Sequence, residues 1–322
     1  MTTIAFNPSL VKPEIAAYLQ EQSKLPIPAT LTPELVRAGF AANFKKFSPY
    51  ASFFPVDSVK DYDISEDHSL LVRVYTPTAD HQKLPLLVYY HGGGWVGNNV
   101  TTHDSICRLL AKRCGCIVVS VDYPLAPEHK FPEIIQQCFA ALTWVFEHAE
   151  KLSGDVNRIG VAGDSSGANL ATIMTLMAKT KLPPIIYQAL ICPVTDLTTL
   201  NTPSYTTYSN FGLSRDKMAW FIQCYLQNAA DAADPLASPL LAPDLSGLPP
   251  TLVVASEFDV LRDDAERYAV RLQQAGVPTV YHCMKKMIHS GIFWALGLPV
   301  IAEEINFISD RMTEGLSLPP KA

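Results

Sequence analysis

Short apolar runs recur along the chain from about residue 71 onward. A near-continuous apolar run bounded by polar or turn residues is typical of a strand buried on both faces of a parallel sheet. The runs that fit this description are Leu71–Tyr75, Leu86–Tyr90, Cys116–Val121, Arg158–Ala162, Ile185–Ile191, Thr251–Ala255 and Thr279–Met284.

Stretches with helical periodicity separate these runs. After Pro132, apolar residues from Ile134 to Phe146 define one helix face. A second pattern runs from Leu261 to Leu272 and ends at Gly276-Val277-Pro278, a helix stop signal. The alternation of strands and helices predicts an α/β class with a mostly parallel sheet of about eight strands, flanked by helices.

Two regions interrupt the alternation, and we expect them to cover the sheet. Residues 1–55 carry helix signals at Pro13–Gln20 and from Thr32-Pro33-Glu34, where Thr caps and Pro occupies the first turn. Residues 195–245 contain a predicted helix, Arg215–Gln227. We therefore predict a single domain over residues 1–322 whose helical cap is built from residues 1–55 and 195–245. Aromatic residues of the first segment fit either a packing face or a substrate pocket: Phe40, Phe44, Phe47, Tyr50, Phe53 and Phe54.

Charge and composition exclude several classes. Twenty-five Lys and Arg against 31 Asp and Glu give a net charge of −6, and no basic cluster exceeds pairs such as Lys45-Lys46, so a nucleic-acid partner is not expected. No apolar run approaches the roughly 18 residues of a membrane span, and a secretion signal is not evident. Seven scattered cysteines without metal-ligand spacing predict reduced thiols, no metal site and a soluble cytoplasmic protein.

The segment Gly163-Asp164-Ser165-Ser166-Gly167 follows one predicted strand and precedes a predicted helix, residues 168–179. This is the setting of a Gly-x-Ser-x-Gly nucleophile elbow, in which glycines let two elements approach closely around an exposed serine. An ordinary glycine-rich turn would share the pattern. Partners of Ser165 are therefore needed to distinguish the two interpretations.

A glycine run, His91-Gly92-Gly93-Gly94-Trp95, ends the predicted strand 86–90. Such a run brings backbone N–H donors close to a reacting carbonyl, where negative charge develops during acyl transfer. The spacing Gly92-x-Gly94-x-x-Gly97 also fits a dinucleotide-binding fingerprint, with Asp122 ending the next strand. That alternative requires the glycines to open a helix directly, whereas the helix signal here starts only near Thr102-His103.

A serine nucleophile needs a base and an acid, which follow it along the chain in this kind of fold. His282 falls inside a predicted strand, whereas His289 lies in the loop after it, where catalytic groups of α/β sheets occur. Asp259 and Glu257 both follow the strand 251–255 and are candidate acids. Asp263 and Asp264 are expected to be solvated residues of a first helical turn.

Together these segments resemble the hormone-sensitive-lipase-like family of α/β-hydrolase carboxylesterases, especially its bacterial acetyl-esterase branch. The resemblance runs from about Leu71 to Phe293. It rests on the glycine run, on Asp122-Tyr123-Pro124-Leu125-Ala126-Pro127-Glu128, on the Ser165 segment, on Asp259-Val260-Leu261-Arg262-Asp263 and on the His289 loop.

The resemblance implies an α/β-hydrolase fold with Ser165 as nucleophile, Asp259 as acid and His289 as base. It further implies an oxyanion hole formed by the N–H groups of Gly93, Gly94 and Ser166. It requires no cofactor and allows a homodimer. Departures from the usual pattern are Pro124, Ser166, Val260 and Ser290, and none of them removes a catalytic functional group.

The sequence thus predicts a serine carboxylesterase that cleaves short-chain acyl esters through an acyl-enzyme intermediate. An amidase or formamidase with the same triad is an alternative, because the fold does not determine the leaving group. A ligand-binding protein on this fold and an NAD-dependent oxidoreductase are further alternatives. The first is disfavoured by the presence of all three triad residues.

Overall fold

A computed structural model describes residues 4–24, 30–66, 68–78, 83–294, 296 and 299–319. Its centre is a sheet of eight strands: β1 (Ser58–Asp63), β2 (Leu71–Thr76), β3 (Leu84–Tyr90), β4 (Ile117–Asp122), β5 (Gly154–Asp164), β6 (Tyr187–Ile191), β7 (Thr251–Phe258) and β8 (Thr279–Ile288). The spatial order is β1-β2-β4-β3-β5-β6-β7-β8. Strand β2 pairs antiparallel with β1 and β4, and the remaining pairs are parallel.

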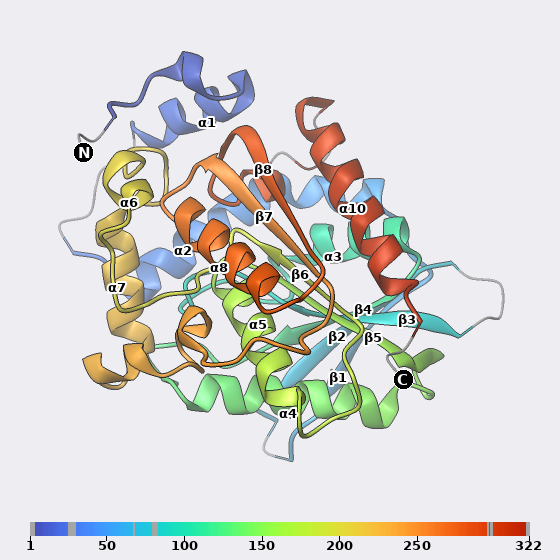
Figure 1. Ribbon diagram of the computed structural model, residues 1–322. Coiled ribbons are helices and arrows are strands. Elements are labelled where there is room, and N and C mark those ends of the chain that lie inside the picture. The colour runs from blue at the N-terminus through green and yellow to red at the C-terminus, as the bar shows by residue number, and fades with distance from the viewer. Residues whose placement is uncertain are drawn as a thin grey trace.

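Helices cover both faces of this sheet (Figure 1). They are α1 (Pro13–Gln22), α2 (Pro33–Phe47), α3 (Asp104–Cys114), α4 (Glu133–His148), α5 (Ser166–Ala178), α6 (Pro203–Thr207), α7 (Arg215–Tyr225), α8 (Arg262–Gln274), α9 (Gly291–Trp294) and α10 (Ala302–Leu316). Short 3-10 turns span residues 8–10, 48–53, 229–233, 239–241 and 299–301. The predicted α/β class and all seven predicted strands are confirmed.

Side chains of each central strand alternate between two hydrophobic cores, as the period of two requires. In β3, Val88 and Tyr90 join the core beneath α4, α5 and α8. Leu87 and Tyr89 point the other way, into the core beneath α3 and α10. Both faces of the sheet are therefore covered, and the polar side chains within the strands, such as Ser120 and Gln188, are themselves fully buried.

The two segments that interrupt the strand–helix alternation lie side by side. The Ile4 N–H donates to the Thr207 carbonyl at 3.1 Å, and the rings of Phe6 and Phe211 meet edge to face with centroids 5.8 Å apart. Figure 1 shows α1 and α2 on the same side of the molecule as α6 and α7. Residues 1–3 and 25–29 of the predicted cap lie outside the described part.

The aromatic residues of the first segment do not act as one group. Phe54 is buried in the core beneath α3, whereas Phe53 is 56% exposed. Phe40 lies against the backbone at Gly97. Packing therefore explains Phe54, and Phe40 belongs to the surroundings of the glycine loop described below.

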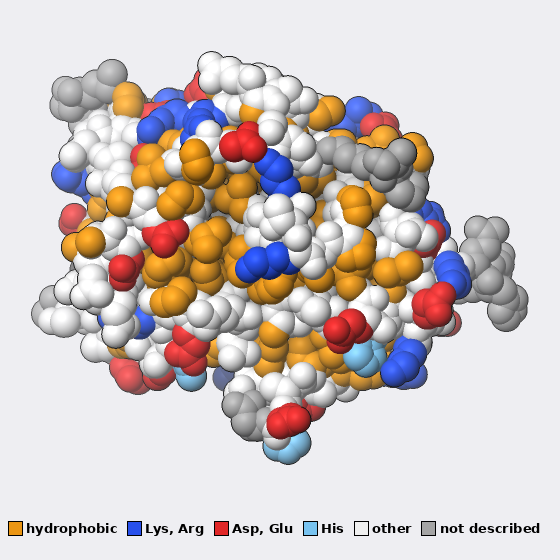
Figure 2. Space-filling view, turned by 60° about the horizontal axis from the view of Figure 1, so that its bottom comes forward, with side chains coloured by type: hydrophobic (Ala, Val, Ile, Leu, Met, Phe, Trp, Pro, Cys, Tyr) orange, Lys and Arg blue, Asp and Glu red, His pale blue; other side chains and the backbone are white. Residues whose placement is uncertain are grey.

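On the face turned forward in Figure 2, acidic and basic side chains are interspersed with apolar ones. This mixture is consistent with the small net charge of −6. Among the described residues, no helix is both long enough and apolar enough to cross a bilayer.

One expectation about a carboxylate is wrong. Asp264 is fully buried rather than solvated. Its Oδ2 accepts N–H bonds from Thr195 at 3.0 Å and Asp196 at 3.2 Å, so it anchors the chain that leaves β6 to the first turn of α8. Asp263 is also held, by the Ser204 N–H at 2.8 Å. These partners are distant in sequence, so helical periodicity could not indicate them.

Burial of Asp264 predicts a pH-dependent stability. Desolvation raises the pKa of its carboxyl from 3.8 to about 7 in the folded protein. The folded state therefore binds this proton more tightly than the unfolded state, and the associated stability is lost as pH rises from about 3.8 through about 7. We expect Asp264→Asn, which carries no charge at any pH, to lack this component. Denaturant unfolding of both proteins across that pH range measures it, and parallel curves would contradict it.

Candidate active site

Ser165 lies at a tight turn between β5 and α5. Its backbone has φ 54° and ψ −121°, and its N–H donates to the Ile191 carbonyl at 2.8 Å. A positive φ in a residue with a side chain costs on the order of 1–3 kcal/mol and persists only where the surroundings enforce it. At Ser165 the surroundings enforce the positive φ, because the chain on either side of it is closely packed. A Cβ on Gly163 would lie 2.4 Å from Gly167, and one on Gly167 would lie 2.0 Å from the Tyr90 carbonyl oxygen.

Three of the predicted residues form one chain of hydrogen bonds. His289 Nε2 lies 2.9 Å from Ser165 Oγ, and His289 Nδ1 lies 2.7 Å from Asp259 Oδ2. A carboxylate only accepts, so Nδ1 carries the proton and Nε2 is left to accept from the serine hydroxyl. The second oxygen of Asp259 accepts the Leu261 N–H at 2.9 Å. The carboxylate is thereby fixed on both sides.

Each of the three residues follows the carboxyl end of a strand. Ser165 follows β5, Asp259 follows β7, and His289 follows β8, which continues to Ile288 and so reaches four residues beyond its predicted end. Ser290 takes a left-handed backbone, φ 51°, so the turn forms without a glycine.

The alternative candidates lie elsewhere. His282 Nε2 is paired with Glu304 Oε2 at 2.7 Å. Glu257 accepts the N–H of Lys286, an exposed residue of β8, at 2.9 Å. Of the two predicted acids, Asp259 is therefore the one that contacts His289.

The glycine run after β3 makes a compact loop rather than a helix. The N–H groups of Val96 and Gly97 both donate to the Gly93 carbonyl, at 3.2 and 3.1 Å, and Gly93 and Gly94 have φ 131° and 63°. Because α3 begins only at Asp104, the dinucleotide-binding interpretation is wrong. Within the described part of the chain, no hydrogen bond occupies the N–H of Gly93 or Gly94.

Ser166 joins this loop to the serine turn. Its Oγ accepts the Trp95 N–H at 3.2 Å, a bond that alanine at this position could not make. Its own backbone N–H begins α5, where no carbonyl of the same helix can accept it. The substitution noted in the sequence therefore adds a contact and leaves the backbone donor available.

Buried polar groups support the loop from below. Asp164 accepts the Gly92 N–H at 2.9 Å and the Tyr89 hydroxyl at 2.8 Å, and His103 Nε2 lies 3.2 Å from it. His91 stacks on Tyr123 with ring centroids 4.2 Å apart. Burial lowers the pKa of His91 to about 3, so this imidazole is neutral near neutral pH.

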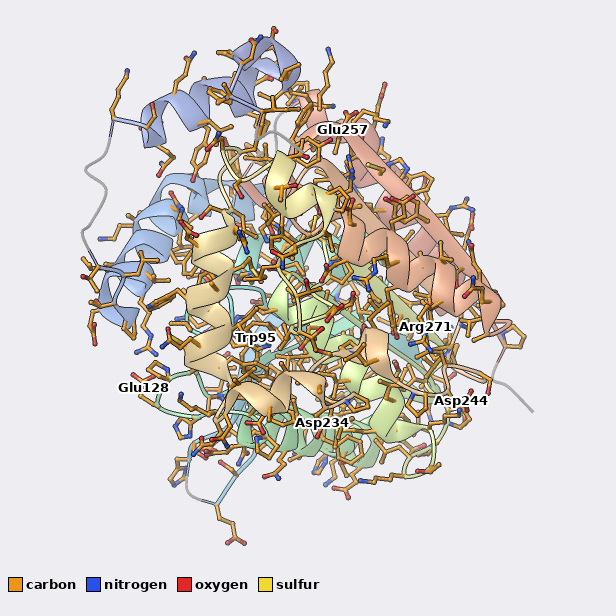
Figure 3. The ribbon with its side chains drawn as sticks, turned by 60° about the vertical axis from the view of Figure 1, so that its left-hand side comes forward. Trp95, Glu128, Asp234, Asp244, Glu257 and Arg271 are labelled. Atoms are coloured by element: carbon orange, nitrogen blue, oxygen red, sulfur yellow. The ribbon has the colours of Figure 1, made fainter. Side chains whose placement is uncertain are left out.

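Helix α7 closes over the same loop. Trp95 stacks on Tyr225 with centroids 4.2 Å apart and planes 7° from parallel, and Trp95 lies against this helix in Figure 3. A Cβ on Gly94 would lie 2.2 Å from the ring of Phe221. The loop can therefore take this position only with glycine at 94.

Sequence reasoning missed Arg37, which holds the loop from α2. Its guanidinium donates to the Val96 carbonyl at 2.9 Å and the Ala126 carbonyl at 3.1 Å. It also makes a two-pronged bond to Glu128, at 2.6 and 2.8 Å. The partners are 59 to 91 residues away along the chain, so only the glutamate offered a signal in the sequence, a charge opposite to that of Arg37.

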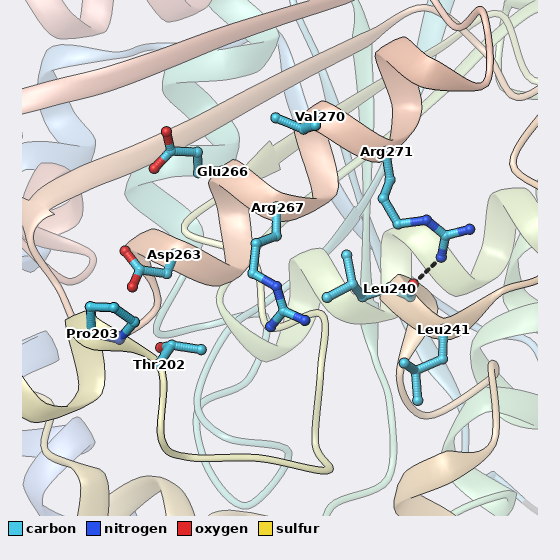
Figure 4. Close-up of a pocket in the computed structure, with 9 residues that line it drawn as sticks. All are labelled: Thr202, Pro203, Leu240, Leu241, Asp263, Glu266, Arg267, Val270 and Arg271. Carbon is cyan, nitrogen blue, oxygen red and sulfur yellow. Dashed lines mark hydrogen bonds between the residues drawn. The ribbon is translucent and has the colours of Figure 1, made fainter.

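A surface groove on α8 is separate from this site (Figure 4). It is lined by apolar side chains such as Leu240, Leu241 and Val270. Arg271 lies at one end of the groove and donates to the carbonyls of Leu240 and, at 2.8 Å, Ala242. None of the residues around Ser165 lines the groove.

The fold and the serine–histidine–aspartate arrangement define a hydrolase of the α/β class. The family model for the alpha/beta hydrolase fold matches residues 87–293. The carboxylesterase NlhH of Mycobacterium tuberculosis is 42% identical over 237 residues, which cover 72% of this chain and 74% of that protein. The ethyl acetate hydrolase of Pseudomonas putida is 39% identical over 228 residues, 69% of this chain and 71% of that protein.

A solved structure agrees with the family model and with these two relatives. The hyperthermophilic esterase from Pyrobaculum calidifontis superposes with a TM-score of 0.89 at 38% identity, and the match covers 94% of this chain and 98% of that one. The chain belongs to the alpha/beta hydrolase fold family, which confirms the predicted fold and the resemblance to its esterases.

Arg37 yields a prediction about rate. We expect Arg37→Met to lower kcat for ester hydrolysis about tenfold with little change in KM, because a displaced loop misplaces donors that act only in the transition state. Glu128→Gln is the matched control, since it keeps the two carbonyl contacts of Arg37. Steady-state kinetics of both variants decide the matter. Equal losses of kcat in the two variants would mean that the ion pair with Glu128, and not the two carbonyl contacts, positions the loop.

Proposed function

We propose that this carboxylic-ester hydrolase cleaves short-chain acyl esters, with Ser165 as nucleophile, His289 as general base and acid, and Asp259 as the group that orients the imidazole. The observation that carries the proposal is the chain of hydrogen bonds from Ser165 Oγ through His289 to Asp259, at 2.9 and 2.7 Å. Nucleophile, base and orienting group within hydrogen-bond reach are what acyl transfer requires.

The reaction proceeds in two halves. Ser165 Oγ attacks the ester carbonyl while its proton passes to His289 Nε2, and a tetrahedral oxyanion forms. Collapse of this tetrahedral intermediate breaks its bond to the alcohol oxygen. The alcohol takes the proton from His289 and leaves, and Ser165 remains acylated. Water then attacks the acyl-serine by the same route, and the carboxylic acid is released with the serine restored.

We assign the oxyanion site to the N–H groups of Gly93, Gly94 and Ser166. Two facts support this assignment. The first two donors belong to the glycine loop, which the bond from the Trp95 N–H to Ser166 Oγ holds in place. The third donor lies at the N-terminal end of α5, where the helix dipole favours negative charge. Fixed donors of this kind stabilise the intermediate without reorganising during the reaction.

The preference for short acyl groups follows from the proposed cap. We take residues 1–55 and 195–245 as its two parts. The ring of Phe221 lies directly over Gly94 and that of Phe40 over Gly97, which restricts the space beside the loop. The name of the relative from Pseudomonas putida, an ethyl acetate hydrolase, supports a small acyl group.

We also propose a reducing compartment, the cytoplasm, as the site of action. All seven cysteines are unpaired, and five of them are buried, as expected where thiols stay reduced. A homodimer remains a prediction of the family resemblance, and sedimentation of the purified protein tests it.

The first test measures hydrolysis of chromogenic esters of increasing acyl length, without added cofactor. We expect turnover to be highest for acetyl to butyryl esters and Ser165→Ala to lose at least about 10⁴-fold in kcat. Ser166→Ala is the matched control, because it keeps the backbone N–H and loses the side-chain bond to Trp95, so severalfold loss is expected. A folded wild-type protein that ignores the esters but cleaves the matching anilides would make it an amidase.

The second test is the pH dependence of kcat/KM. Burial lowers the pKa of His289, but the adjacent Asp259 carboxylate outweighs this effect, and the net pKa lies above the usual 6.5. The imidazole must be neutral to accept the serine proton, so activity should rise with pH through a midpoint above 6.5. Asp259→Asn should move the midpoint down and lower kcat by about 10⁴. A midpoint that stays in place would show that another group titrates.

A further inference from the structure

Cys192 lies beside the serine–histidine–aspartate arrangement and has no part in the proposed reaction. It directly follows β6, is fully buried, and has a left-handed backbone with φ 49°. Its N–H donates to the Val254 carbonyl at 2.7 Å, and its Sγ is 3.4 Å from Ser256 Oγ. The backbone around the thiol is therefore held in place.

The thiol completes a cluster of metal-binding groups. One donor atom from each of Cys192, Asp259 and His289 lies within 4.8 Å of the other two. These residues follow β6, β7 and β8, which are neighbours in the sheet. Their spacing is thus maintained by strand pairing rather than by a mobile loop. Cys192 and Asp259 are buried, which distinguishes the cluster from the acidic groups common on protein surfaces.

The donor set fits a soft or borderline cation. Thiolate sulfur, imidazole nitrogen and carboxylate oxygen all bind Zn²⁺, with bonds of about 2.0–2.3 Å. At those lengths, ligand atoms of a tetrahedral site stand about 3.5 Å apart. The three donor atoms therefore need to shift relative to one another by about 1.3 Å or less to share one ion, and a water molecule can take the fourth position. Thiolate favours Zn²⁺ and Cd²⁺ over hard ions such as Mg²⁺.

We infer that Cys192, Asp259 and His289 form a binding site for a thiophilic divalent cation, and that occupation of this site inhibits the enzyme. On binding, the cysteine thiol releases its proton to solvent and its sulfur donates an electron pair to the cation. The imidazole and the carboxylate bind the same ion. Ser165 then keeps its proton, because the imidazole that would accept it is coordinated. No oxidation state changes, and a chelator reverses the process.

The binding part of this inference is independent of the proposed function, and only the inhibition part rests on it. The first experiment is therefore a binding measurement with Cd²⁺ on the full-length Ser165→Ala variant, prepared free of metal. A cadmium–thiolate bond has an ultraviolet charge-transfer absorption that needs no catalysis to be seen. We expect one equivalent of Cd²⁺ to produce this band.

Matched cysteine variants identify the thiol. Adding Cys192→Ser should abolish the band, while Cys224→Ser, which removes a half-buried thiol on α7, should leave it intact. Cys192→Ala is the second variant if the serine substitution disturbs folding, which circular dichroism reports. A band that persists without Cys192, or disappears without Cys224, overturns the inference.

The second experiment measures ester hydrolysis by the protein with Ser165 present, under Zn²⁺ or Cd²⁺ titration. We expect inhibition that excess chelator reverses, and an inhibition constant at least about tenfold higher in Cys192→Ser, each variant being compared with its own metal-free rate. Equal inhibition constants contradict the inference. Cadmium binding by a protein that hydrolyses no ester would instead refute the proposed function and leave the cation site standing.

Discussion

The close approach of Gly163, Gly167 and the end of β3 is the constraint on which the rest of the site depends. Gly167, in the first turn of α5, lies so close to the carbonyl oxygens of Tyr90 and His91 that a Cβ would be 2.0 and 2.5 Å from them. This contact forces the chain to turn at Ser165, where φ is 54°. The serine side chain is thereby placed outside the sheet, beside the ends of β6, β7 and β8.

Burial and hydrogen bonding then keep the surrounding groups in place. Asp164 is buried beneath the glycine loop, where an unpartnered carboxylate would be costly. Its contacts with Tyr89, Gly92 and His103 offset that cost and tie the loop to the end of β5. The loop's upper side is closed by the stacked Trp95 and Tyr225. Polar contacts below and aromatic contacts above thus hold one short glycine loop.

The sequence indicates most of the sheet because buried strands carry continuous apolar runs. It does not indicate β1, because the residues of Ser58–Asp63 are all half-buried or exposed, as expected for a strand at the sheet edge. The motifs place Ser165 and His289 because each belongs to a short segment beside a strand end. The choice of Asp259 over Glu257 depends on the direction in which each side chain points, which a linear pattern does not contain.

The contacts of Arg37 and Asp264 with backbone groups were unpredictable for a different reason. Each joins segments that are brought together only by the complete fold, and each binds backbone groups, which leave no trace in the identity of the partner residues. The contact between Phe221 and Gly94 is similar, since an aromatic residue on an amphipathic helix fits ordinary core packing as well as contact with a functional loop.

Recognition of backbone carbonyls by Arg37 also bears on how this protein can diverge. Every residue type presents the same carbonyl, so the attachment of α2 does not depend on which side chains stand at positions 96 and 126. Val96 and Ala126 are fully buried, so core packing, and not their contact with Arg37, limits what can replace them. Selection for the attachment itself therefore falls on one guanidinium.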